Sequence, residues 1–279
     1  MNHHNKQTSP IGVFDSGYGG LTILDEIRKE LPGYDFLYLG DNARTPYGTR
    51  SYDVVYKFTL QCVEFLFKQG CHLVILACNT ASAKALRTIQ QNDLPKIDSD
   101  RRVLGVIRPT AEVVGDLTET NHIGVFATSG TVQSDSYPLE IRKIFPDVEV
   151  TSEACSMWVP LIENNEHLHA GADYFVKKHV GNLMQSDPKI DTVILGCTHY
   201  PLLKGKIEDV LPRNVQVISQ GEIVARSLKD YLRRHPEMEQ KCSKGATTRY
   251  LTTENPKKFS ESASIFLSED IQAEHVEVE

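Results

Sequence analysis

Short apolar runs alternate with segments of helical periodicity along the first third of the chain. Uniformly apolar runs predict strands at residues 11–14, 36–39 and 73–76. Apolar residues recur every three or four positions at 21–31 and 55–66, which predicts helices between those strands. A fully apolar strand is expected where helices cover both faces of a parallel sheet. The pattern therefore predicts βαβ units and a parallel sheet.

The same order of segments returns in the second half. The sequence Ile-Gly-Val-Phe occurs at 11–14 and again at 123–126, 112 residues further on. Val-Ile-Leu-Ala-Cys-Asn at 74–79 is matched by Val-Ile-Leu-Gly-Cys-Thr at 193–198, 119 residues further on. Two matches in the same order and at nearly equal spacing favour an internal duplication. We expect an α/β fold with two pseudo-symmetric lobes, each a mostly parallel sheet flanked by helices, and the active site between them.

The chain after the second repeat is too short for a third α/β domain. Its pattern predicts a helix at 222–234, a polar linker at 235–248, and short strands at 250–252 and 276–278. We expect this segment to pack on the first lobe. The first lobe would then comprise residues 1–106 and 220–279, and the second lobe residues 107–219.

Composition narrows the functional class. The chain has 279 residues, of which 40% are hydrophobic and 24% charged, enough to bury a sizeable core. Its net charge of −7 makes a nucleic-acid partner a poor expectation. The longest apolar run, 73–78, is too short to cross a bilayer, and the polar N-terminal stretch with His3 and His4 does not resemble a secretory signal. We therefore expect a cytoplasmic protein with no membrane partner.

Six cysteines are present, and no two of them form a Cys-x-x-Cys pair. Zinc-ribbon and thioredoxin-like sites are therefore not expected, and neither is any metal. In a reducing compartment the thiols should be free. Cys78 and Cys197 stand out because they occupy the same place in the two repeats, at the end of a buried strand and before a helix. Ligands of open α/β sheets bind at that edge.

The helix that follows each cysteine suggests how the site would work. A helix N-terminus attracts an anion and lowers the pKa of a thiol. Thr80 is the expected N-cap after Cys78, and Pro201 fits the first turn after Cys197. A single cysteine at a strand end is most often a small buried apolar residue, and a disulfide is a further possibility. Two matched thiols instead favour function.

Two thiols on opposite sides of one bound anion fit the inversion of a carbon centre. One thiol removes a proton from one face while the other donates a proton to the opposite face. The sequence has no Walker A pattern, and its lysines nearest to the cysteines, Lys84 and Lys204, lie further along the following helices. No anchor for pyridoxal phosphate is evident, so no cofactor is expected.

Four segments resemble the signature segments of glutamate racemase, in the aspartate/glutamate racemase superfamily. They are residues 14–21, 41–48, 77–82 and 196–202, and the resemblance runs from about residue 11 to about residue 235. It implies a cofactor-independent isomerase that interconverts L- and D-glutamate. It also implies a homodimer that supplies D-glutamate for bacterial peptidoglycan, and so for cell-wall biogenesis and cell shape.

The resemblance also implies roles for single residues. Cys78 and Cys197 would be the two proton donors and acceptors, assisted by Asp15, His199 and Glu163. The substrate-contacting positions would be Asp15, Ser16, Tyr47, Gly48, Asn79, Thr80, Thr198 and His199. The chain departs from the family pattern at Arg108-Pro109-Thr110, where an acidic residue followed by Pro-Gly is usual.

Other functions remain open from the sequence alone. The protein could racemise or isomerise another acidic substrate such as aspartate, or it could be a two-lobed module that binds an anion without reacting. A Cys-His hydrolase would leave one of the two matched cysteines unexplained. The remaining four cysteines are expected to be packing residues, and Met157 and Trp158 to pack between the lobes.

Overall fold

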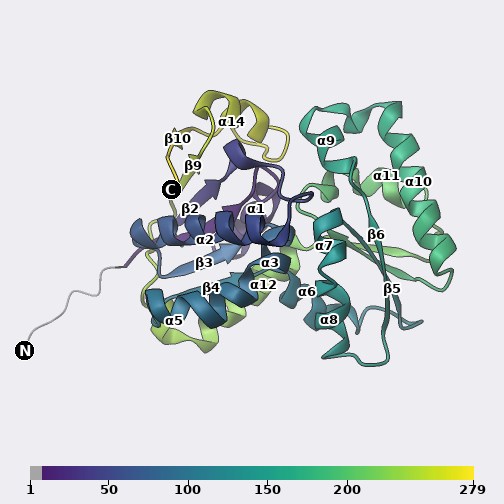
Figure 1. Ribbon diagram of the computed structural model, residues 1–279, viewed down its shortest axis with the longest axis horizontal. Helices are drawn as coiled ribbons and strands as arrows, with labels where there is room; N and C mark the ends of the chain where they lie inside the picture. Colours follow the sequence, from purple (N-terminus) through teal and green to yellow (C-terminus); the bar gives the residue numbers. More distant parts are fainter. Residues whose placement is uncertain (1–7) are drawn as a thin grey trace, which may run out of the picture.

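The computed structural model describes residues 8–279. It shows two parallel β-sheets with helices on their faces (Figure 1). The predicted polar tail with His3 and His4 lies outside the described residues. Every ladder within both sheets is parallel, which confirms the predicted fold class. We call the part built on the six-stranded sheet the first lobe and the part built on the four-stranded sheet the second lobe.

The first sheet has the strand order β10-β9-β2-β1-β3-β4. Its strands are β1 (Ile11–Asp15), β2 (Phe36–Gly40), β3 (Leu73–Leu76), β4 (Arg102–Gly105), β9 (Thr248–Thr252) and β10 (Ala273–His275). The second sheet has the order β6-β5-β7-β8. Its strands are β5 (His122–Ala127), β6 (Glu149–Ala154), β7 (Thr192–Gly196) and β8 (Gln216–Ile218).

Helices connect the strands in each lobe. Around the first sheet lie α1 (Leu21–Glu30), η1 (Asn42–Arg44), α2 (Tyr52–Lys68), α3 (Asn79–Lys84), α4 (Leu86–Thr88), η2 (Ile89–Asp93), α5 (Leu94–Ile97), α12 (Gly221–Arg234), α13 (Pro236–Glu239) and α14 (Pro256–Ala263). With the second sheet come α6 (Ile107–Val114), α7 (Ser129–Gln133), α8 (Ser136–Arg142), α9 (Trp158–Glu163), η3 (Glu166–Leu168), α10 (Ala170–Ser186), η4 (Tyr200–Leu203) and α11 (Lys204–Glu208).

The two sheets repeat one another strand by strand. The order β2-β1-β3-β4 in the first lobe corresponds to β6-β5-β7-β8 in the second. The register repeats as well, because Gly12 pairs with Val74 and Gly124 pairs with Val193. These four residues are related by the two spacings found in the sequence. The structure thus agrees with an internal duplication.

Side chains alternate between the two faces of each sheet, as a period of two requires. In β1, Ile11 and Val13 belong to the core that α1 and α12 cover, whereas Phe14 belongs to the core covered by α2. The second lobe is built the same way, with α10 on one face of its sheet and α6 and α8 on the other. Both sheets are therefore covered on both faces, which explains the apolar runs in the central strands β1, β3, β5 and β7.

The prediction that Met157 and Trp158 pack between the lobes is wrong. Trp158 is fully buried inside the second lobe, against Phe126, His179 and Tyr200. Met157 is exposed. The indole reaches into the second core because Trp158 is the first residue of α9, which lies over that core.

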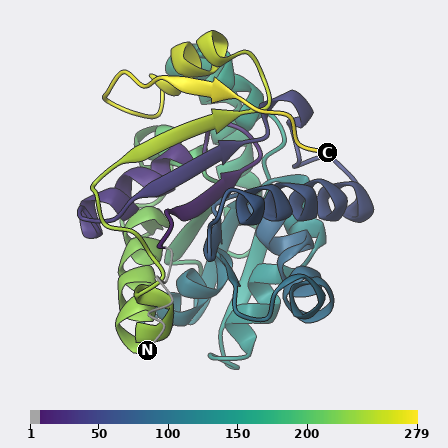
Figure 2. The same cartoon turned by 90° about the vertical axis from the view of Figure 1, so that its left-hand side faces the viewer.

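The C-terminal segment adds β9 and β10 to the edge of the first sheet, next to β2 (Figure 2). The linker predicted at 235–248 contains α13. The strand predicted at 276–278 is wrong, because pairing occurs at 273–275 and stops where β9 ends, at Thr252. Val276 and Val278 pack instead against the core under α2. The domain limits at 106/107 and 219/220 remain a prediction.

Candidate active site

Cys78 and Cys197 lie at the carboxyl ends of corresponding strands, β3 and β7, and both are buried and free. Cys78 is itself the N-cap of α3, because its Sγ accepts a hydrogen bond from the amide of Ala81 at 3.4 Å. The prediction that Thr80 caps this helix is therefore wrong. After Cys197 the chain turns into η4, with Pro201 in its first turn as predicted.

Burial dominates the chemistry of Cys78. Burial raises the pKa of its thiol to about 12, and the charges of Asp15 and Cys197 add to the rise. Hydrogen bonds from Ser16, whose Oγ lies 3.3 Å from Sγ, and from the Ala81 amide lower the pKa but do not offset burial. The start of α3 thus lowers the pKa of Cys78 through the Ala81 amide, but the predicted net lowering is wrong, because desolvation disfavours the thiolate more strongly.

Asp15 ends β1 and is completely buried beside this thiol. Its Oδ2 accepts a hydrogen bond from the Gly17 amide at 2.9 Å, while its Oδ1 is buried without a hydrogen-bond partner. Burial raises the pKa of the carboxyl, and the charge of His199 from the other lobe lowers it. Hydrogen bonds from the backbone of Gly17 and Gly20 also lower this pKa, so the turn that leads into α1 helps to hold the carboxyl.

The second thiol has a different set of neighbours. His199 Nδ1 lies 3.9 Å from Cys197 Sγ, and His199 Nε2 lies 2.9 Å from Glu163 Oε1 at the end of α9. Burial alone would lower the pKa of His199, but its hydrogen bonds to Cys197 and Glu163 raise it to about 10. An imidazolium between a thiol and a carboxylate can both stabilise a thiolate and hold a proton for it.

Two loops of the first lobe contact the second lobe closely. A Cβ at Gly19 would overlap Thr198 and His199, so only glycine lets this loop approach the second lobe so closely. On the other side, a Cβ at Gly48 would come within 2.9 Å of Thr128, and the amide of Gly130 donates to the Gly48 carbonyl at 2.7 Å. The lobes thus touch at both loops, and Cys78 and Cys197 are each buried.

Three of the predicted substrate-contacting side chains are held by hydrogen bonds. The Tyr47 hydroxyl donates to Asp41, whereas the neighbouring Gly48 reaches the second lobe. Thr80 Oγ1 lies 2.9 Å from Thr128 Oγ1, across the lobes. Asn79 hydrogen bonds to Tyr137 and Gln220.

The structure adds residues that sequence reasoning missed. They are Asp41, Thr128, Tyr137 and Gln220, which hold the predicted residues in place. Thr128 lies 112 residues after Ser16, so the spacing of the duplication could have revealed it. Asp41 stands within one of the signature segments. No comparable signal marked Tyr137 or Gln220.

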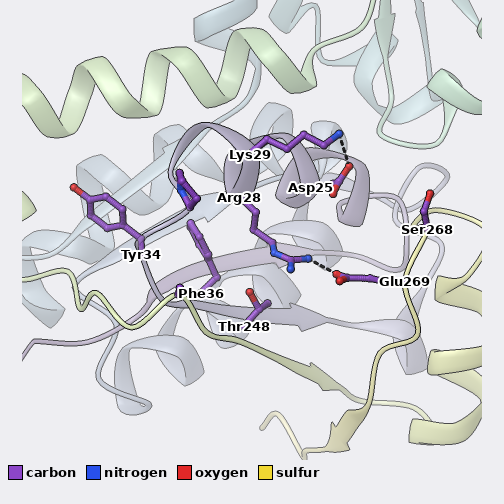
Figure 3. A pocket seen from close by; sticks show the side chains of 10 residues that line it. Asp25, Arg28, Lys29, Tyr34, Phe36, Thr248, Ser268 and Glu269 are labelled. Carbon is purple, nitrogen blue, oxygen red and sulfur yellow. Dashed lines mark hydrogen bonds and ion pairs between the residues drawn. The ribbon is translucent and has the colours of Figure 1, made fainter.

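Two cavities lie away from the cysteines. One, of about 450 Å³, opens between α1 and the edge of the first sheet, where Arg28 pairs with Glu269 and Lys29 with Asp25 (Figure 3). The other, of about 570 Å³, is lined by residues of α3, α6, α8 and α12, including Arg108 and Pro109 of the segment that departs from the family pattern. Neither includes a predicted site residue.

Among residues 8–279, no group of three His, Cys, Asp or Glu side chains is arranged to hold a metal ion. Within the same range, no helix has both the length and the apolar character needed to cross a membrane.

Comparison with known proteins gives consistent matches along the chain. Residues 11–228 match the family described as Asp/Glu/Hydantoin racemase. A glutamate racemase of Dinoroseobacter shibae is 43% identical over 277 residues, covering 96% of this chain and 98% of the relative. The crystal structure of a glutamate racemase isoform from Bacillus anthracis superposes with a TM-score of 0.88 at 35% identity, covering 97% of this chain and 98% of that one. A glutamate racemase of Francisella tularensis in complex with D-glutamate gives 0.84 at 34% identity, with 98% and 97% covered.

Proposed function

The chain belongs to the Asp/Glu/hydantoin racemase family, and from that premise we propose that it racemises glutamate by passing the Cα proton between Cys78 and Cys197. It is an amino-acid racemase, which is an isomerase, and similar proteins that cover nearly its whole length are glutamate racemases. The observation that carries the two-cysteine proposal is the placement of both thiols at corresponding strand ends, each beside its own ionisable partner.

The reaction needs one base and one acid at opposite faces of Cα. In one direction the Cys78 thiolate removes the proton while the Cys197 thiol donates its own proton to the other face; in the reverse direction the roles exchange. Each turnover leaves one thiol and one thiolate, so no other reactant is consumed. The rise in the pKa of Cys78 to about 12 makes its thiolate a stronger base, which suits a weakly acidic Cα–H.

The neighbours of each thiol would share the proton handling. His199, with its raised pKa and its contact to Glu163, would keep a proton close to Cys197. Asp15 would assist Cys78 as the buried carboxyl beside it. Ser16, Tyr47, Gly48, Asn79, Thr80 and Thr198 would complete the contacts to the substrate, whose developing negative charge is stabilised by fixed donors.

Closure of the lobes is part of the proposal. Contacts at Gly19 and Gly48 exclude water, which would otherwise solvate the thiolate and weaken it as a base. We propose that residues 1–106 with 220–279 and residues 107–219 move apart as two bodies to admit glutamate, as in other enzymes that close over their substrates. We also propose a homodimer that needs no cofactor and supplies D-glutamate for peptidoglycan, and so for cell-wall biogenesis and cell shape.

Solvent labelling tests the proposal. The protein is incubated with L-glutamate in deuterated buffer, and the products are followed by chiral chromatography and mass spectrometry. D-glutamate is expected to form with one deuterium at Cα, because the proton that is delivered comes from a thiol in exchange with solvent. Conversion without solvent label would eliminate the two-base mechanism. A parallel incubation with L-aspartate distinguishes a glutamate racemase from an enzyme for another acidic substrate.

A further inference from the structure

Three buried polar side chains form a closed ring of hydrogen bonds where the two lobes join. Asn79 Nδ2 donates to Gln220 Oε1 at 2.8 Å, Gln220 Nε2 donates to the Tyr137 hydroxyl at 2.7 Å, and that hydroxyl donates to Asn79 Oδ1 at 2.7 Å. Each member donates once and accepts once within the ring. Such a ring fixes the orientation of both carboxamides. Reversing Asn79 alone would set its oxygen against the Gln220 oxygen, and reversing Gln220 alone would set its nitrogen against the Asn79 nitrogen.

The ring connects the segments that carry the two cysteines. Asn79 directly follows Cys78 and is the first residue of α3. The Tyr137 ring packs beside Gly196, directly before Cys197, where a Cβ would come within 3.1 Å of the aromatic carbon Cε2. A single hydrogen bond between Tyr137 and Asn79 therefore spans the gap between the two strand ends.

Gln220 links this ring to both segments that connect the two lobes, one after β4 and one before α12. It precedes α12, where the chain returns to the first lobe, and its Nε2 also lies 2.9 Å from Thr110 Oγ1. The Thr110 hydroxyl in turn donates to the carbonyl of Val106, just after β4, at 3.1 Å. The hydrogen-bond network thus reaches the strand ends and both connections.

We propose that Tyr137 and Gln220 are positioning residues for the racemisation, which hold the Asn79 carboxamide in place and thereby set the Cys78 strand end relative to Cys197. The proposal rests on the proposed function, since it assigns these residues to the same reaction. Only one of the two Asn79 amide hydrogens is used in the ring, so the other is available to a carboxylate oxygen of the substrate. If Asn79 is misplaced, both substrate affinity and proton transfer suffer, because near-attack geometry is lost.

The test compares two buried tyrosines of the second lobe. Tyr137→Phe removes a hydroxyl that bridges the lobes, whereas Tyr200→Phe removes a hydroxyl that donates to the Cys155 carbonyl at 3.0 Å within one lobe. Both variants should melt at a lower temperature. Only Tyr137→Phe is expected to raise KM for glutamate about tenfold and to lower kcat about tenfold or more. Equal kinetic effects in the two variants, or none in Tyr137→Phe, would overturn the proposal.

A double-mutant cycle tests whether the ring acts as a unit. Gln220→Met removes the carboxamide that donates to Tyr137 and accepts from Asn79. The double variant Tyr137→Phe/Gln220→Met should lose little more activity than either single variant. Effects that simply multiply would argue against a shared role. Thr110→Val, which touches only the outer end of the network, is expected to change KM about threefold in the same direction. It keeps the test decisive if a stronger variant does not fold.

Ligand binding separates this proposal from the proposed function. D-glutamate should raise the melting temperature of the wild type and of Tyr200→Phe, but raise that of Tyr137→Phe much less at the same concentration. If the wild type failed to racemise glutamate while this difference persisted, the proposed function would fall and the ring would retain its role in binding. If D-glutamate stabilised all three proteins equally while the wild type was active, the ring proposal would fall alone.

Discussion

The two cysteine sites come from duplicated strands, but their neighbours are not duplicated. At the end of β1 the first lobe has Asp15 and Ser16, whereas the second lobe has Ala127 and Thr128 at the corresponding positions. After β3 the first lobe has Thr80, whereas the second lobe has His199 in that place. Each lobe therefore carries its ionisable group at a different strand end. The fold is repeated, whereas the ionisable neighbours of the two cysteines are not.

This difference shows how one scaffold can hold two thiols in unlike environments. Cys78 lies beside a buried carboxyl and a hydroxyl, which leaves its pKa raised to about 12. Cys197 lies beside an imidazole that is itself held by a carboxylate. Under the proposed mechanism, the two faces of the substrate Cα would meet two different partners. Matching substitutions beside Cys78 and beside Cys197 should therefore have different effects.

The largest expected effect is the loss of either thiol. Cys78→Ala and Cys197→Ala should each lower kcat for racemisation by about 10³-fold or more, because inversion needs a group at both faces of Cα. Racemisation is measured by circular dichroism from each enantiomer. Cys242→Ala, a buried cysteine at the far end of the first lobe, is the matched control and should keep near-normal turnover. Near-normal turnover in either variant of the pair would refute the two-thiol mechanism.

A smaller loss is expected when the partner of Cys197 is removed. His199→Asn should lower kcat/KM about 100-fold, and Glu163→Gln about tenfold, because the amide still offers a hydrogen bond to the ring. Since enantiomers are equal in energy, kcat/KM must fall equally in both directions. The two enantiomers should instead differ in the rate at which solvent deuterium enters substrate that has not been converted. This rate should fall more for the enantiomer whose Cα proton Cys197 removes. Equal slowing for both enantiomers would contradict a separate role for each site.

The partner of Cys78 can be tested against its counterpart in the other lobe. Ser16→Ala removes the hydrogen bond that lowers the pKa of Cys78, so that pKa should rise further and alkylation of Cys78 at fixed pH should slow several-fold. Thr128→Val changes the residue at the corresponding position, which contacts Thr80 instead of a thiol. It should leave the alkylation rate within about twofold. Mass spectrometry of alkylated peptides gives both rates, and a reversed order would break the comparison.

The smallest expected effect is on stability. The pKa of His199 is raised from an ordinary 6.5 to about 10, so the stability it contributes is complete below pH 6.5 and is lost as the pH rises to 10. The melting temperature of the wild type relative to His199→Asn should therefore decline over this interval, by a few degrees. Thermal unfolding at closely spaced pH values measures it. A difference that stays constant from pH 6 to pH 10 would show that His199 does not gain a proton on folding.

The local sequence was enough to predict the central strands, the two lobes and several candidate site residues. The apolar runs fixed β1, β3, β5 and β7 in advance, because a buried strand between covering helices requires them. The spacing of the repeats predicted the two lobes and singled out Cys78 and Cys197. Signature segments indicated Asp15 and His199, which the structure places close enough for the charge of one to lower the pKa of the other.

The tertiary structure decided what those residues experience. A pattern of residue types could not show that burial would outweigh the helix N-terminus at Cys78, since desolvation depends on every element packed around the thiol. Nor could it reveal the ring of Asn79, Tyr137 and Gln220, whose members lie 58, 83 and 141 residues apart in pairs. Local periodicity records which face of an element is buried. Only the folded chain determines which distant side chains come into contact there, and the pKa values and hydrogen bonds of the site depend on those contacts.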